Sequence, residues 1–103
     1  MSLEKEFVLK FFCCNETQFK LIFKIDEQQC IEDAISNNQV IIEQSMIIIQ
    51  RIDKWAGSRF GAVAWFTSET IPSLAYTPLE AIQDGYFDAV IQYIEAIEIG
   101  GYA

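Results

Sequence analysis

Apolar residues recur every three or four positions in the middle of the chain, which is the spacing of one face of an α-helix. This pattern predicts one long helix from Val40 to Trp55, and Gly57 is a suitable C-terminal stop. The apolar positions are Ile41, Ile42, Ile48, Ile49, Ile52 and Trp55. The segment carries more isoleucine than one stripe requires, since residues 46–49 are all apolar. The helix is therefore expected either to lie at the centre of the core or to face a second chain as well.

Two further helices are expected between this segment and residue 85. Ser58 suits the N-cap of a short helix that runs through Phe66, followed by a loop over residues 67–76. The apolar contributions of that helix are Phe60, Val63, Ala64 and Trp65. The run Thr77-Pro78-Leu79-Glu80 then combines a threonine N-cap, a proline at the first helical position and a glutamate three residues after the cap. Asp84-Gly85 ends this second helix, because glycine readily adopts the left-handed cap geometry.

The last predicted helix is strongly amphipathic. Its apolar face holds Phe87, Val90, Ile91, Ile94 and Ile97, and its polar face holds Asp88, Gln92 and Glu95. Gly100-Gly101 is expected to end it.

The first 38 residues fit two different structures. Alternation of apolar residues with Lys10, Lys20 and Lys24 suits a β-hairpin that turns through Asn15-Glu16. Helical features compete with it, because Leu3, Phe7, Phe11 and Cys14 also share a helical face, and Asn15 with Gln18 resembles a cap. We favour helices here, with Asp26 capping a further one through about Ile35.

These patterns together predict an all-α fold. It is a small single-domain helical bundle with a long central helix and a C-terminal amphipathic helix, and the N-terminal β-hairpin is the alternative for its first part. A chain of 103 residues can close one core that buries roughly 60 to 70% of its unfolded surface. A hydrophobic content of 51% indicates that it folds despite a formal net charge of −8.

Location is predicted from what the sequence lacks. No apolar run approaches the roughly 20 residues needed to span a bilayer, and the N-terminus has no signal-peptide pattern. Three cysteines, two of them adjacent as Cys13-Cys14, suit a reduced cytoplasmic protein better than a disulfide framework. We expect these cysteines, including Cys30, to act as small core residues.

Catalytic chemistry is not predicted. The chain has no histidine, which removes the commonest general base and metal ligand. Its five glycines match neither the P-loop nor the dinucleotide fingerprint, and its cysteines lack zinc-site spacing. The adjacent carboxylates Glu32-Asp33 are better explained as a solvated face than as an acid pair. We therefore expect no enzyme activity, no cofactor and no metal, and assign no catalytic residue.

Charge is distributed unevenly along the chain. All seven basic residues lie at or before Arg59, so residues 60–103 hold six acids and no base. The acids are Glu69, Glu80, Asp84, Asp88, Glu95 and Glu98. Two interpretations stay open, a solvated acidic surface and a surface shaped to meet a basic partner. The net charge disfavours a generic nucleic-acid binder or a contact with anionic lipid.

The order of these elements resembles the toxin-binding domain of the MbcA/ParS/Xre antitoxin family. That family has a Trp before a loop of the type N-P-x-L-G-G, a T-P-x-E/D-L/I helix start, a helix that ends in I-E-x-G, and a G-V-[FY]-[SAV] tail. The residues in step with it are Trp65, Pro72, Leu74, Thr77, Pro78, Leu79, Glu80, Ile97, Gly100, Tyr102 and Ala103. The resemblance covers about residues 40–103. It departs at Ala75-Tyr76, where many members have Gly-Gly, and at Gly101, where valine is usual.

The resemblance implies an antitoxin of a bacterial type II toxin–antitoxin pair. Its partner would be a RES-domain toxin that degrades NAD, and its tail, Gly100, Gly101, Tyr102 and Ala103, would occupy the active site of that toxin. Tyr102 would pack in the cleft, and the Ala103 carboxylate would pair with an arginine that otherwise holds an NAD phosphate. Without the resemblance, the same four residues would be a frayed terminus after a glycine cap. Trp65 is expected to be a core residue.

The division expected from this resemblance is an N-terminal segment, residues 1–38, and an antitoxin-type toxin-binding domain, residues 39–103. The first segment would be a shortened or degenerate helix-turn-helix-like unit, since family members carry about 50 residues there. A homodimer is expected through the isoleucine-rich helix. The alternatives to an antitoxin are a DNA-binding transcriptional regulator and a stand-alone dimeric helical interaction module. DNA binding is not favoured, because the first 25 residues carry little net positive charge.

Overall fold

The computed structural model describes residues 3–101, and in that range the chain folds into α-helices joined by short turns. The helices are α1 (Lys5–Phe11), α2 (Glu16–Phe23), α3 (Ile31–Asn37), α4 (Gln39–Ala56), α5 (Arg59–Ser68), α6 (Pro78–Gln83) and α7 (Phe87–Ala96), and α7 continues into the π-helical turn η1 (Ile97–Gly101). No strand occurs in this range, although one isolated bridge pairs Ile71 with Tyr76. The predicted all-α, single-domain bundle is confirmed.

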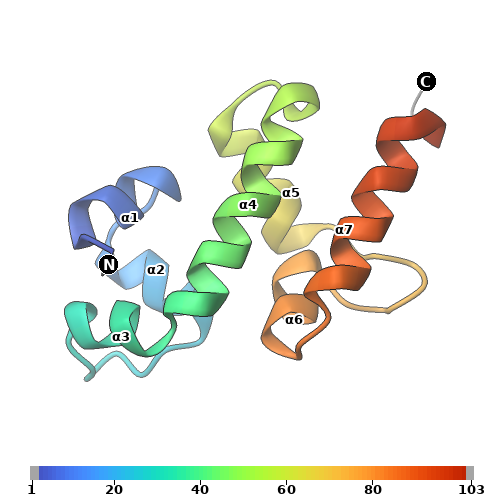
Figure 1. Ribbon diagram of the computed structural model, residues 1–103. Coiled ribbons are helices and arrows are strands. Elements are labelled where there is room, and N and C mark those ends of the chain that lie inside the picture. Colours follow the sequence, from blue (N-terminus) through green and yellow to red (C-terminus); the bar gives the residue numbers. More distant parts are fainter. Residues whose placement is uncertain (1–2, 102–103) are drawn as a thin grey trace.

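Helix α4 is the centre of the bundle. It contacts α3, α5, α6 and α7, and Figure 1 shows the small N-terminal helices on one side of it and α6 and α7 on the other. Ile42, Ile48, Ile49 and Ile52 on this helix are completely buried. The expectation that this helix lies at the centre of the core is therefore confirmed.

One hydrophobic cluster runs through both predicted segments of the chain. It begins at Val8 in α1 and ends at Ile94 in α7. Residues 1–38 therefore contribute their described apolar side chains to the same core as residues 39–103, rather than forming a core of their own.

The N-terminal part is helical, so the β-hairpin alternative was wrong. Asn15 Oδ1 accepts a hydrogen bond from Gln18 N at 2.8 Å, and Asn15 N donates to Gln18 Oε1 at 2.9 Å, which is a complete capping box. Phe19 and Phe23, four residues apart on α2, lie on one helical face and pack with Phe12. Local capping and this aromatic cluster outweigh the alternation that also suits a strand.

The prediction that Asp26 caps the third helix was also wrong. Its Oδ1 accepts from Gln28 N at 2.8 Å, which closes a short turn instead of starting a helix. The helix begins five residues later, and its N-cap is Cys30, whose Sγ accepts from Asp33 N at 3.4 Å. Ile31, the first residue of this helix, is buried in the core, so tertiary packing favours this start in addition to the Cys30 cap.

The C-terminal helices begin and end close to their predicted positions. Ser58 Oγ accepts from Gly61 N at 2.9 Å, and Thr77 forms a second capping box with Glu80. Gly57 and Gly85 have φ values of 88° and 90°, the left-handed cap conformation that was predicted for Gly85 and that glycine favours. Helix α5 extends to Ser68, two residues beyond the prediction.

The loop between α5 and α6 turns through a left-handed alanine. Ala75 has φ of 59°, a conformation that costs an L-residue with a Cβ roughly 1–2 kcal/mol. Two backbone hydrogen bonds hold it there, from Ala75 N to Ile71 O at 2.9 Å and from Ile71 N to Tyr76 O at 2.8 Å. This is the segment where the resembling family has Gly-Gly, so the departure in sequence falls on a backbone that would favour glycine.

Candidate partner-binding surface

The end of α7 is the first candidate surface, because the predicted site begins there. Ile99 is 87% exposed, the highest value among the large exposed apolar side chains of the described residues. The helical backbone breaks at Gly100, which adopts an extended φ of 179°, and no atom lies within 4 Å of where a Cβ would project. Gly101 is the last described residue, and the predicted contacts of Tyr102 and Ala103 lie outside the described residues.

Arg51 of α4 anchors this helix end to the bundle. Its Nη2 lies 2.6 Å from Glu98 Oε1, and its Nη1 lies 3.9 Å from Glu95 Oε2. Figure 1 shows α4 and α7 running in the same direction. The segment before Gly100 is therefore held in place, and Ile99 at its end is exposed.

A cluster of three aromatic rings connects α4, α5 and α7. Trp65 of α5 packs edge-on against Trp55 of α4, with 5.4 Å between ring centroids, and stacks on Tyr93 of α7 at 6.3 Å. All three are partly buried and pack against the hydrophobic cluster. Trp65 is thus part of the core packing, as expected.

Acidic side chains are spread over the C-terminal half of the chain, and two of them, Glu95 and Glu98, lie at this helix end. Of the six acids after residue 60, only Glu80 is half-buried, and the other five are exposed. The backbone hydrogen bond from Thr77 lowers the pKa of the Glu80 carboxyl. A hydrogen bond with Asp84 raises the pKa of the Tyr76 hydroxyl. In the described range, Arg51 and Lys24 reach this surface from the N-terminal half, pairing with Glu95, Glu98 and Glu80.

An apolar groove between α2 and α5 is a second candidate surface, which the sequence did not predict. It has a volume of about 380 Å³, and its lining carries no Lys, Arg, Asp or Glu. Leu21, 74% exposed, and Phe60, 71% exposed, stand at the groove. Phe60 had been expected to pack inward. The periodicity of α5 is weak, so the sequence did not distinguish its inward face from its outward face.

The expectation that the cysteines are core residues was wrong for Cys13 and Cys30, whereas Cys14 packs against the hydrophobic cluster. Cys13 and Cys30 are exposed, and Cys14 is half-buried. Cys13 is in the left-handed conformation that ends α1, φ 56°, and Cys30 is used as an N-cap. Cys13 and Cys14 both line the groove, where burial raises the pKa of the Cys14 thiol to about 11. Cys14 is therefore a protonated apolar lining group at neutral pH, not a nucleophile.

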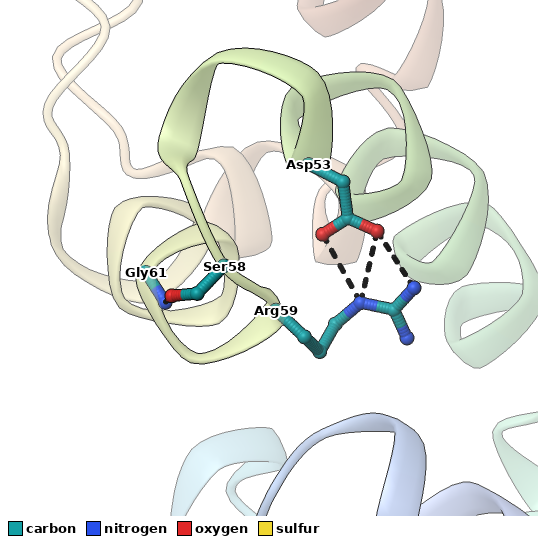
Figure 2. A network of polar contacts seen from close by, with 4 residues as sticks. All are labelled: Asp53, Ser58, Arg59 and Gly61. Atoms are coloured by element: carbon teal, nitrogen blue, oxygen red, sulfur yellow. Dashed lines mark hydrogen bonds and ion pairs between the residues drawn. The ribbon is translucent and has the colours of Figure 1, made fainter.

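A bidentate ion pair holds the corner between α4 and α5. Figure 2 shows Arg59 facing Asp53 across the corner between α4 and α5, with its Nη2 at 2.7 Å and its Nε at 3.1 Å from the carboxylate. The guanidinium also lies over the Phe11 ring, 3.9 Å from its centroid. The hydrogen bond with Asp53 raises the pKa of Arg59 further. This pair ties the corner between α4 and α5 to α1.

The remaining charged side chains of the described residues form no chemical site. No group of three potential ligands could hold a metal ion there. Glu32 and Asp33 are both exposed, as a solvated face should be, and Lys5 lies 3.8 Å from Glu32 and 3.3 Å from Glu16. None of the helices in residues 3–101 combines the length and the apolar character that crossing a bilayer requires.

Comparison with known proteins identifies no relative. No protein-family model, no curated protein and no solved structure matches the chain.

Proposed function

We propose that this protein is the antitoxin of a type II toxin–antitoxin pair and acts by binding rather than by catalysis. Its C-terminal residues, Gly100 to Ala103, enter the active-site cleft of a RES-domain toxin that degrades NAD, and so block access of NAD to that cleft. The proposal comes from the resemblance of residues 40–103 to the antitoxin family, and the form of the α7 end supports it.

The observation that carries the proposal is the exposed, anchored end of α7. Ile99 is almost fully exposed, and a glycine follows it. Arg51 fixes the preceding turn through Glu98 and Glu95. A presented segment of this kind loses little conformational freedom at its base when it binds, which favours insertion into a cleft.

The charge of the C-terminal half of the chain also suits this partner. A cleft that holds an anionic dinucleotide is expected to be basic, and Glu69, Asp84 and Asp88 are exposed acids on the same half of the chain. Complementary charge would speed the encounter and make it depend on salt concentration.

The experiment measures cellular NAD and growth while the product of the adjacent gene is expressed with this protein. One variant ends at Ile99, which keeps Glu98 and its contact with Arg51, so its fold should be retained. A matched control removes two residues from the other end, Met1 and Ser2. We expect the full chain and the control to preserve NAD, and the chain that ends at Ile99 to fail.

Two outcomes would overturn the proposal. If the shortened chain remains folded by circular dichroism and still protects NAD, the tail is not the inhibitory element. If the neighbouring product leaves NAD unchanged, the protein is not an antitoxin of this class. Binding to upstream DNA that weakens steeply with salt would then favour the regulator.

A further inference from the structure

The outward face of α4 has the residue spacing of a helix–helix contact. Five of its side chains are exposed, at intervals of three, four, three and four residues: Val40, Glu43, Ile47, Gln50 and Lys54. Such alternating spacing places side chains on one narrow stripe of a helix, as along the seam of a coiled coil. Two of the five are large apolar residues, Val40 at 66% exposure and Ile47 at 46%.

This stripe is accessible along the helix. All five of its side chains are exposed, whereas the residues of α4 that pack on α5 and the other helices are buried or half-buried. The helix has 18 residues, which corresponds to a length of about 27 Å.

The charged residues of the stripe are arranged to match a second copy in the opposite direction. Glu43 and Lys54 are equally far from a point between residues 48 and 49, and lie roughly 16 Å apart along the helix. A two-fold axis at that point would place Glu43 of each copy beside Lys54 of the other, twice. The same axis would bring the two Ile47 side chains together near the centre and pair each with Gln50 of the other copy.

We propose that this stripe of α4 is the surface on which a second copy of the chain docks, with the two α4 helices antiparallel. Ile47 forms the apolar centre, and two Glu43–Lys54 pairs fix the direction and register. Although each copy carries a net charge of −8, the stripe itself has one acid and one base and is neutral. At about 0.15 M salt, repulsion between more distant acids is screened within about 8 Å.

Sedimentation velocity at about 0.15 M salt, over a range of protein concentrations, measures the monomer–dimer equilibrium. We expect the wild type to dimerise, and Ile47→Glu to weaken the dimer by at least about tenfold, since it buries two like charges at the centre. The matched control is Leu21→Glu, which adds the same charge to an exposed apolar site outside the stripe. Because both positions are on the surface, the two variants should keep the helical circular dichroism of the wild type.

A charge exchange tests the direction of the two helices. E43K and K54E should each lower dimer affinity, on the order of tenfold, because each sets two pairs of like charges face to face. An equimolar mixture of the two variants should form a heterodimer, since both of its end pairs are then opposite in sign. The double variant E43K/K54E should dimerise like the wild type.

The alternatives give different results. A wild type that stays monomeric up to about millimolar concentration would overturn the proposal. If Leu21→Glu disrupts the dimer and Ile47→Glu does not, the copies associate through the groove between α2 and α5. A double variant as weak as the single ones would exclude the antiparallel register. None of these results depends on a toxin, so they leave the proposed function to its own test.

Discussion

The two halves of the chain differ in charge but share one core. Residues 1–59 contain every lysine and arginine, whereas residues 60–103 contain six acids and no base. In the structure, Lys24 pairs with Glu80 and Arg51 with Glu95 and Glu98, so part of this imbalance is neutralised across the two halves. The charge boundary after Arg59 is therefore not a domain boundary, because one hydrophobic cluster runs from Val8 to Ile94.

The largest expected effect comes from breaking the shared core at its N-terminal end. Phe12→Ala removes a buried ring that packs on Phe19 and Phe23, and should lower the free energy of unfolding by about 3–4 kcal/mol. Chemical denaturation followed by tryptophan fluorescence and by circular dichroism measures this. Both tryptophans lie in α4 and α5, so the two probes should shift together.

The control for this change is Leu21→Ala, which shortens an exposed apolar residue of the neighbouring helix and should be nearly neutral. If Phe12→Ala unfolds the first three helices while the midpoint of the tryptophan transition is unchanged, the two halves unfold independently and do not share one cooperative core.

The two capping boxes offer a matched test, because one lies in each half. Asn15→Ala removes the cap of α2, and Thr77→Ala removes the cap of α6. Each should cost about 1 kcal/mol in the free energy of unfolding, since one backbone N–H loses its acceptor. Thermal and urea denaturation measure both, with Thr17→Ala in α2 as the neutral control. A loss confined to one of the two variants would mean that the caps are not equivalent.

The ion pairs that cross the charge boundary should contribute less. Arg51→Gln removes the contacts with Glu98 and Glu95, whose side chains are partly exposed, so the expected loss is about 0.5 kcal/mol. Hydrogen exchange should accelerate at the amides of residues 97–100 more than in α5. Lys10→Gln, which removes an exposed base of α1, is the control. Unchanged exchange at the α7 end would show that Arg51 does not anchor it.

The smallest expected effect is a dependence on pH at Glu80. Its pKa is lowered in the folded protein, mainly by the backbone hydrogen bond from Thr77. The charged carboxylate therefore stabilises the fold above its unfolded pKa, and this contribution is lost as pH falls through the folded value. Glu80→Gln should lose less stability than the wild type between about pH 5 and pH 3. Parallel curves for the two proteins would contradict this assignment.

Local signals predicted what local interactions determine. The caps at Asn15, Ser58 and Thr77 and the left-handed Gly85 each depend on residues within four positions, and all are present in the structure. The prediction that Asp26 caps α3 was wrong for a different reason. Asp26 fits a cap pattern, but its carboxylate closes a turn with Gln28, and α3 begins at Ile31, which is buried in the core.

The candidate surfaces were harder to predict than the fold. Exposure of Phe60 and of Cys13 depends on how α5 and α2 meet, which is a contact between residues far apart in sequence. The acidic C-terminal half and the C-terminal tail could be identified from the sequence, because charge and position in the chain do not depend on the fold. The position of the exposed Ile99 could not be predicted, because it depends on the contact between Arg51 and Glu98, which are far apart in sequence.

The shared direction of α4 and α7 has a consequence for stoichiometry. Because α7 ends at the same end of the bundle as α4, two copies joined by antiparallel α4 helices would place their α7 ends at opposite poles of the dimer. Each tail could then be occupied without steric conflict with the other. A complex of two chains with two partner molecules is expected, with the second partner binding as tightly as the first.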